Sequence, residues 1–252
     1  MARKPKKVEA LKPQLPKVMV EEAVRAALLE DLGRAGDITT DATIPADARA
    51  KAVLATREDG ILSGLPLAEA AFRAIDPALK FKALKVDGDR LKAKQVVARI
   101  EGNARAILAG ERVALNYLMR MSGIATYTAA FQDLLEGTGA RITCTRKTVP
   151  LHRAFDKYAV KCGGGSNHRF GLDDAILIKD NHIAVAGGVA LAIERARAFV
   201  GHLVKVEVEV DTLKQFREAL KAGPDVVLLD NMTTEQLAQA VAINKADNVS
   251  RV

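Results

Sequence analysis

Cationic side chains gather in two short segments near the middle of the sequence. Residues 145–148 read TRKT, and residues 157–183 read KYAVKCGGGSNHRFGLDDAILIKDNHI, with three consecutive glycines and the pair His168-Arg169. Arginine binds carboxylates and phosphates through two parallel hydrogen bonds, whereas lysine supplies a compact point charge. The two segments therefore predict a site for a ligand that carries several negative charges.

Charged side chains also follow short apolar runs that are typical of strands. The expected strands are residues 142–145, 175–178, 203–210 and 225–229, and the expected helices are residues 189–200, 212–222 and 234–243. This alternation predicts a parallel sheet, open or closed into a barrel. Arg146, Lys179 and Asp230 each follow a strand. The sequence thus predicts that they meet at the carboxyl edge of the sheet, where (β/α) barrels carry their chemistry.

The run VEVEVD at residues 206–211 places three acids on one face of the third strand. Side chains alternate along a strand, so Glu207, Glu209 and Asp211 share a face and the valines occupy the other. Buried carboxylates need cations, and Mg²⁺ takes a few carboxylates together with ligand phosphates. Asp230 could share such an ion. The plainer alternative is an edge strand with a solvated acidic face.

The first half of the sequence has the pattern of a small α/β domain. The expected elements are helices at residues 21–32 and 65–75, a loop at 36–40, and strands at 51–56, 81–86 and 95–100. Residues 104–135 read as helix with a break near Ser122-Gly123, which we interpret as the hinge between the halves. The predicted organisation is a disordered basic tail at residues 1–18, an N-terminal α/β domain at 19–118 and a barrel domain at 119–252.

Composition narrows the class of protein. With 252 residues, 49% of them hydrophobic, the chain can bury a substantial core. The formal charge is +7, but the first seventeen residues hold six basic groups against Glu9, so the remaining body is nearly balanced. That tail has no aromatic residue to stack on bases, and no nucleic-acid partner is expected.

The cysteine count and the apolar runs bear on the compartment. Cys144 and Cys162 form neither a disulfide framework nor a CxxC zinc motif, which favours a reducing cytoplasm. No apolar h-region follows the basic N-terminus, and no apolar run is long enough to span a bilayer. Neither secretion nor a membrane partner is expected.

An ordered set of motifs resembles the quinolinate phosphoribosyltransferase family. The motifs are LLEDLGRAGDITT at residues 28–40, ERVALNYLMRMSGIAT at 111–126, TRKT, KYAVKCGGGSNHR, LIKDNHI, VEVEVD and LLDN. They occur in the family's order and cover nearly everything after the tail. The resemblance implies an N-terminal α/β sandwich-like domain followed by an open, incomplete α/β barrel. It also implies a homodimer in which one subunit's N-terminal region completes the other's site.

Matching the motifs residue by residue gives each charged side chain an expected role. The resemblance assigns substrate binding to six cationic side chains, namely Arg112, Arg146, Lys147, His168, Arg169 and Lys179. It assigns catalytic roles to four groups, namely Lys147, Lys179, Glu209 and Asp230. The two lysines would lie between quinolinate and phosphoribosyl pyrophosphate, and the two acids near the ribose hydroxyls and a Mg²⁺ cofactor. Glu207 has no counterpart in the motif.

The reaction that the resemblance implies requires no covalent protein nucleophile. The pyridine nitrogen of quinolinate attacks the ribose anomeric carbon as pyrophosphate leaves, and the quaternised ring then accepts the electrons left by decarboxylation. The products are nicotinate mononucleotide, pyrophosphate and CO₂, which places the enzyme in NAD biosynthesis. The alternatives are a related phosphoribosyltransferase for another anionic heterocycle or nicotinate itself, and a truncated non-catalytic homologue.

The end of the sequence departs from the family pattern. Family members continue past the LLDN strand with a glycine- and serine-rich loop and a final strand-loop that hold the ribose 5-phosphate. This sequence ends at Val252 after NKADNVSRV, which contains no Gly-rich cradle. We therefore expect a C-terminally truncated barrel with an unpaired sheet edge.

Several of these residues also have plainer interpretations. Arg112 could be a surface charge on a long helix, and the glycines at 163–165 either form a flexible turn or permit close backbone packing beside His168. We expect His182 to order the loop after Lys179 rather than to bind a metal, because no partner ligand lies at helical spacing. Both cysteines are interpreted as small structural residues.

Overall fold

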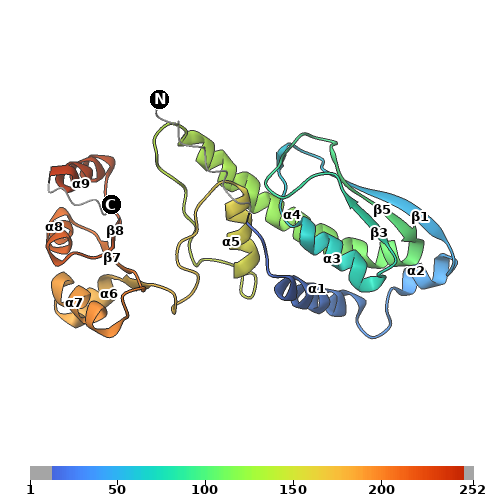
Figure 1. Cartoon of the computed structure of the whole chain (residues 1–252), viewed down its shortest axis with the longest axis horizontal. Coiled ribbons are helices and arrows are strands. Elements are labelled where there is room, and N and C mark those ends of the chain that lie inside the picture. The colour runs from blue at the N-terminus through green and yellow to red at the C-terminus, as the bar shows by residue number, and fades with distance from the viewer. Residues whose placement is uncertain (1–12, 247–252) are drawn as a thin grey trace, which may run out of the picture. The chain divides into compact units, whose positions relative to one another are not determined.

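The computed structural model describes residues 13–246, which form two compact units (Figure 1). The first unit extends through His168, and the second begins at Arg169. Most of the predicted tail, residues 1–12, lies outside the described residues, and the first helix already begins at Lys17. None of the helices in the described part of the chain combines the length and the apolarity needed to cross a bilayer.

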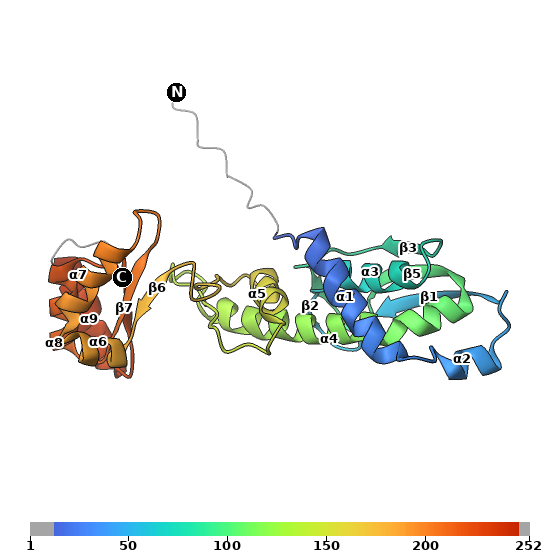
Figure 2. The ribbon, with the colours of Figure 1, turned by 90° about the horizontal axis from the view of Figure 1, so that it is seen from below.

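The first unit combines five helices with an antiparallel three-stranded sheet and a short two-stranded sheet. Its strands are β1 (Arg49–Ala55), β2 (Gly60–Ile61), β3 (Lys80–Ala83), β4 (Arg90–Leu91) and β5 (Val96–Asn103), and its helices are α1 (Lys17–Leu32), α2 (Ile38–Thr43), α3 (Leu65–Ile75), α4 (Ala104–Leu134) and α5 (Arg153–Cys162). The main sheet has the order β1-β5-β3, and Figures 1 and 2 show α3 beside α4. Phe72, Leu79, Ile100 and Met121 are almost completely buried in the shared core.

The predicted break in the helix near Ser122-Gly123 is wrong, because α4 runs without interruption from Ala104 to Leu134. The side chain of Asn103 caps its first turn by accepting a hydrogen bond from the Ala106 amide at 3.0 Å. A single exposed glycine costs a helix only about 1 kcal/mol relative to alanine. The packing of the buried face of α4, which includes Met121, outweighs that cost.

The predicted loop at residues 36–40 is also wrong in part, because α2 begins at Ile38. The Asp37 carboxylate accepts a hydrogen bond from the Thr40 amide at 3.0 Å, which is the usual capping arrangement of an aspartate before a helix. Hydrogen bonding from the Thr40 side chain, and secondly from the Thr40 amide, lowers the pKa of Asp37. Asp37 is therefore the N-cap of a helix, although the run GDITT resembles a turn in sequence.

Polar contacts fix α5 on the rest of the first unit. Arg120 of α4 forms an ion pair with Asp156, at 2.8 Å between Nη2 and Oδ2, and Asp156 is only 7% exposed. Asp87 accepts hydrogen bonds from the Gly64 and Leu65 amides, at 2.9 and 3.1 Å, and from the Tyr158 hydroxyl at 2.9 Å. Burial raises the pKa of Asp87, and the three hydrogen bonds act in the opposite direction.

The second unit is an open parallel sheet with helices packed on it (Figure 2). Its elements are β6 (Ile176–Ile178), α6 (Asp180–Ala186), α7 (Val189–Phe199), β7 (Val206–Val210), α8 (Leu213–Ala222), β8 (Val226–Leu229) and α9 (Thr234–Ala246). The order is β6-β7-β8, and among the described residues β6 and β8 each pair only with β7. The fold is thus the predicted α/β architecture with an open, incomplete barrel.

The predicted strand at residues 142–145 is wrong. Only one isolated bridge forms there, between Thr143 and Ser166, and it is parallel. The apolar run is too short and too polar at its odd positions to form a ladder. Its backbone is nevertheless placed beside the segment that carries His168.

The glycines at 163–165 permit close packing, as predicted. A Cβ atom at Gly163 would lie 2.3 Å from the Ala125 carbonyl oxygen of α4, and one at Gly165 would lie 2.8 Å from both Thr128 and Val160 side chains. The chain can therefore leave α5 in contact with α4 only where these side chains are missing.

We expect Gly163→Ala to lower the free energy of unfolding by about 1 to 3 kcal/mol, because the added methyl group overlaps the backbone of α4. The matched control is Gly123→Ala, on the exposed side of α4 with no atom within 4 Å of the added methyl. It should raise stability by about 0.5 to 1 kcal/mol, the usual gain from glycine to alanine in a helix. Urea denaturation followed by circular dichroism measures both. A Gly163→Ala protein as stable as the wild type would contradict the packing argument.

Candidate active site

Two adjacent segments of the first unit carry three of the predicted substrate-binding residues. The Ser166 amide donates to the Ile142 carbonyl at 2.7 Å, and the Cys144 amide donates to the Ser166 carbonyl at 3.1 Å. Arg146 and Lys147 follow directly on the first segment, and His168 on the second. The pairing of the two segments thus brings the TRKT motif and the His168 motif to one region.

Two arginines keep buried donors that have no partner in the described residues. The Nε atoms of Arg146 and Arg169 are both buried without a hydrogen bond, although Arg169 donates through Nη1 to the Ala175 carbonyl at 3.1 Å. A buried donor without an acceptor costs about 1 to 3 kcal/mol, so proteins rarely retain one without a reason. A bound carboxylate or phosphate would supply the acceptor that each guanidinium lacks.

The carboxyl edge of the parallel sheet in the second unit carries the other predicted catalytic groups. Lys179 follows β6 and forms an ion pair with Glu209 of β7, at 2.7 Å from Nζ to Oε2. Asp230 follows β8, and the Asn231 amide donates to Asp230 at 3.0 Å and to Asp211 at 3.3 Å. Three neighbouring strands therefore deliver ionic groups to one edge, as predicted for Lys179, Glu209 and Asp230. The prediction is wrong for Arg146, which follows no strand of this sheet.

The acidic strand has the predicted facial division. Val206, Val208 and Val210 are at most 1% exposed, whereas Glu207 and Glu209 are half-buried on the opposite face. The alternative of an edge strand is wrong, because β7 lies between β6 and β8. A half-buried carboxylate is stabilised by a nearby cation, and Lys179 supplies one to Glu209.

The donor set of this edge fits a Mg²⁺ ion only with help from a ligand. Among residues 13–246, no group of three or more His, Cys, Asp and Glu side chains could hold a metal ion. The side-chain amide of Asn231 nevertheless donates to both Asp230 and Asp211, whose carboxylates offer hard oxygen donors. Mg²⁺ commonly binds one or two carboxylates and completes its shell with water and substrate phosphates.

Arg112 stands apart from the other predicted residues of its unit. It lies on α4 with an exposed side chain, and its guanidinium makes no hydrogen bond or ion pair in the described residues. Within a single chain, Arg112 is therefore a surface charge on a long helix, which is the plainer of the two interpretations of this residue.

His182 has the role that the sequence predicted for it. It lies in the first turn of α6, and its Nδ1 atom accepts a hydrogen bond from the Lys179 amide at 2.9 Å. This is the geometry of a capping box, in which the third helical residue binds back to the residue before the helix. His182 therefore fixes the backbone from which the Lys179 side chain extends.

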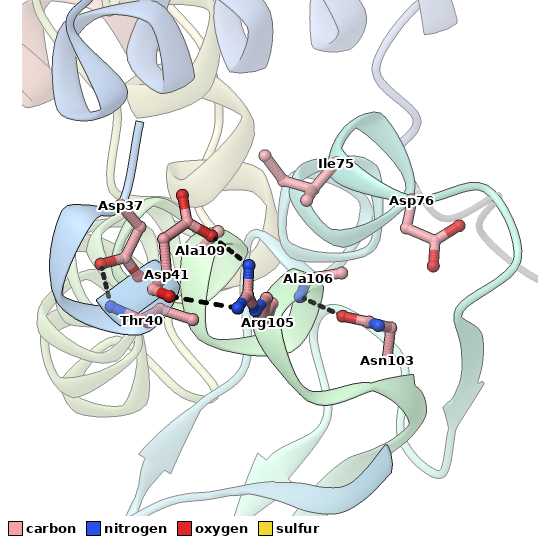
Figure 3. Close-up of a pocket in the computed structure, with 9 residues that line it drawn as sticks. All are labelled: Asp37, Thr40, Asp41, Ile75, Asp76, Asn103, Arg105, Ala106 and Ala109. Atoms are coloured by element: carbon pink, nitrogen blue, oxygen red, sulfur yellow. Dashed lines mark hydrogen bonds and ion pairs between the residues drawn. The ribbon is translucent and has the colours of Figure 1, made fainter. Parts of the chain in front are cut away.

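A cavity of about 330 Å³ in the first unit does not coincide with these residues (Figure 3). Its lining residues are Asp37, Thr40, Asp41, Ile75, Asp76, Asn103, Arg105, Ala106 and Ala109. Arg105 donates to the Asp41 side chain at 2.8 Å and to the Ile44 carbonyl at 2.8 Å, so its charge is used within the cavity wall. None of the predicted site residues lines it.

Comparison with known proteins identifies both parts of the chain. The family model "Quinolinate phosphoribosyl transferase, N-terminal domain" matches residues 37–122, and the corresponding C-terminal domain model matches residues 124–252. These matched ranges and the compact units described above are different divisions, and the boundary predicted between residues 118 and 119 stays a prediction.

Relatives with known names or structures cover most of the chain. A probable nicotinate-nucleotide pyrophosphorylase [carboxylating] from Synechocystis is 38% identical over 92% of this chain and 78% of its own length. Its counterpart from Bacillus subtilis is 41% identical over 87% and 75%. The structure of NadC from Streptococcus pyogenes superimposes with a TM-score of 0.88 at 42% identity, covering 92% of this chain and 81% of that one. The nicotinate-nucleotide pyrophosphorylase of Francisella tularensis gives 0.89 at 37% identity, covering 94% and 84%.

We expect His182→Ala to speed hydrogen exchange at the Lys179 amide about two- to tenfold, which corresponds to the loss of about 0.5 to 1.5 kcal/mol for one hydrogen bond. Nuclear magnetic resonance measures this exchange directly. His182→Gln is the matched control, because glutamine at the same position restores a capping box. Equal exchange in the alanine and wild-type proteins would show that His182 does not order this turn.

Proposed function

Because the chain belongs to the quinolinate phosphoribosyl transferase family, we propose that it transfers the phosphoribosyl group of phosphoribosyl pyrophosphate to quinolinate with loss of CO₂. The products are nicotinate mononucleotide, pyrophosphate and CO₂, and the reaction belongs to NAD biosynthesis. The observation that carries the proposal is the buried, partnerless Nε atom of Arg146 beside the His168 segment. A pyridine dicarboxylate supplies the acceptors that such a cationic pair requires.

Quinolinate binding uses the cationic residues of the TRKT and His168 motifs. Arg146 offers a forked pair of donors to one carboxylate, and His168 with Arg169 offers donors to the other. Positive charge from these groups neutralises the dianion, and their backbone placement sets the direction of the ring nitrogen. Orientation of this kind accounts for much of the rate in a reaction between two bound substrates.

Lys147 and Lys179 stabilise the charges that change during transfer. Negative charge grows on the departing pyrophosphate as the anomeric carbon becomes oxocarbenium-like, and fixed ammonium groups stabilise that change without reorganisation. Glu209 holds Lys179 in place through its ion pair. After transfer, the positive charge of the quaternised pyridine nitrogen stabilises the electron pair that stays on the adjacent ring carbon when CO₂ leaves. A proton from water then takes the place of the lost carboxylate, so decarboxylation needs no further cofactor.

Asp230 and Glu209 are the residues that we assign to a Mg²⁺ ion bound with the pyrophosphate. The ion would neutralise the phosphate oxygens and make pyrophosphate a better leaving group. Asp230 lies at the carboxyl edge of the sheet with one oxygen on Asn231, which leaves its second oxygen for a metal or a ribose hydroxyl. Glu209 lies at the same edge of the sheet, where it also pairs with Lys179.

A direct assay tests the proposed reaction. Quinolinate with phosphoribosyl pyrophosphate and Mg²⁺ should release CO₂ and form nicotinate mononucleotide, whereas nicotinate should give no comparable product. Chelation of Mg²⁺ should abolish turnover, and added Mg²⁺ should restore it. Arg146→Lys should lower kcat/KM for quinolinate about 10- to 100-fold, because lysine keeps the charge and loses the forked hydrogen bonds.

Arg141→Lys is the matched control for this assay. Arg141 is exposed five residues before Arg146, and the same substitution there should leave kcat/KM within about twofold of the wild type. Faster turnover of nicotinate or of another anionic heterocycle would favour the related transferase activity. A folded chain that turns over neither would favour a non-catalytic homologue.

We also propose a homodimer in which Arg112 of one subunit serves the site of the other. Its exposed guanidinium without a partner supports this arrangement, since an isologous interface places the same residue in both sites. For the cellular location, we propose the cytoplasm, which cell fractionation tests by recovery of the chain in the soluble fraction.

Subunit mixing tests the shared site. Arg112→Ala and Arg146→Ala should each be nearly inactive, but refolding an equal mixture should recover about a quarter of wild-type activity. The reason is that half of the dimers are mixed and each mixed dimer contains one intact site. A mixture as inactive as its parents, in a protein that sediments as a dimer, would show that Arg112 does not act across the interface.

A further inference from the structure

Lys157 is a buried lysine that the proposed mechanism leaves without a role. Its side chain lies in α5 and is only 2% exposed. The ammonium donates to the Cys144 Sγ atom at 2.9 Å and to the His168 carbonyl oxygen at 3.0 Å. It forms no ion pair in the described residues. Its two hydrogen-bond partners are a thiol and a neutral carbonyl group.

Such an environment is costly for a positive charge. A buried ammonium is normally balanced by a carboxylate, because neutral hydrogen bonds replace only part of its hydration. An ammonium also has three N–H donors, and two of them have partners here. Among the described residues, the Lys157 ammonium is therefore held by neutral acceptors and has no carboxylate partner of its own.

The two partners of Lys157 belong to the two segments that carry the predicted quinolinate-binding residues. Cys144 lies two residues before Arg146, and the second partner is the backbone of His168 itself. Among the described residues, these segments are otherwise joined by two backbone hydrogen bonds near Ser166 and by a contact from the Cys144 thiol to the Asn167 side-chain oxygen at 3.5 Å. Lys157 thus fastens the His168 backbone directly, beyond the last point at which the two segments pair.

The position of Lys157 is fixed by its neighbours in α5. Asp156 is held by Arg120, and Tyr158 is held by Asp87. Both neighbours anchor the helix without using Lys157. The helix therefore places the ammonium, and the ammonium does not need to hold the helix.

We propose that Lys157 is a positioning residue for quinolinate. It fixes His168 through the backbone carbonyl, and its unbalanced charge makes the region attractive to the substrate dicarboxylate. This inference rests on the proposed function and extends it to a residue outside the expected substrate-binding set. It concerns the dicarboxylate, so phosphoribosyl pyrophosphate binding should be largely independent of Lys157.

Calorimetric titration of the full chain tests the proposal. Lys157→Met keeps an unbranched side chain of similar length and removes the charge and both hydrogen bonds. We expect the Kd for quinolinate to rise about tenfold or more, as for the loss of a hydrogen bond to a charged group, and the Kd for phosphoribosyl pyrophosphate to stay within about twofold. An unchanged Kd for quinolinate overturns the proposal. Equal weakening of both ligands with a lower melting temperature also overturns it, because a merely structural role would act on both.

A double-mutant cycle tests whether Lys157 acts on quinolinate binding through His168. In a His168→Ala background, Lys157→Met should weaken quinolinate binding much less than it does alone, because the residue that it positions is already gone. Fully additive losses overturn the positioning role. Cys144→Ala is the matched control: it removes the sulfur acceptor and keeps the ammonium and its bond to His168, so quinolinate binding should stay within about threefold of the wild type.

Two further outcomes are decisive. If Lys157→Met does not fold, the test uses wild-type protein labelled with ¹⁵N-lysine. The Lys157 ammonium signal is assigned by its change in Cys144→Ala, and quinolinate should change its chemical shift. A chemical shift that quinolinate leaves unchanged overturns the proposal. If the wild-type chain itself binds no quinolinate, the proposed function fails and this inference fails with it. Binding by the wild type and equal binding by the variant sinks the inference alone.

Discussion

The candidate site depends on cationic groups whose buried donors have no anionic partner among the described residues. Arg146 and Arg169 keep buried Nε atoms without acceptors, and the Lys157 ammonium lies on a thiol and a carbonyl. Each of these groups loses hydration that the protein does not replace. The packing around these groups must support that cost, and an anionic ligand is the partner that removes it.

The second unit handles charge in the opposite way. Its central strand β7 presents glutamates on one face, and Lys179 neutralises Glu209 at the carboxyl edge of the sheet. The opposite valine face is buried against α7 and α8, which fixes the register of the strand and hence the direction of the acids. Hydrophobic packing on one face therefore orients the polar chemistry on the other, and a slip of one residue would exchange them.

The spacing of apolar residues correctly predicted those helices and strands whose apolar face is also the face that packs in the core. Helix α3 begins and ends where its apolar spacing indicates, and the alternation in β7 correctly separated its two faces. Predictions failed where one residue was read in isolation. Gly123 suggested a break that the packing of α4 overrides, and the run at residues 142–145 suggested a strand although only Thr143 forms a bridge. The motifs predicted the charged residues of the candidate site, whereas the burial of Lys157 depends on side chains distant in sequence.

The glycines at 163–165 show how a sequence feature without chemistry can control a chemical site. Because Gly163 and Gly165 lack side chains, the end of α5 can contact α4 at the Ala125 carbonyl and Thr128. The chain then turns directly into Ser166, whose two backbone hydrogen bonds align it with the segment before Arg146. Side chains at these glycines would push α5 away from α4 and carry Lys157 with it. Close backbone packing at Gly163 and Gly165, just before Ser166, therefore helps to set the separation between the Lys157 ammonium and the His168 carbonyl.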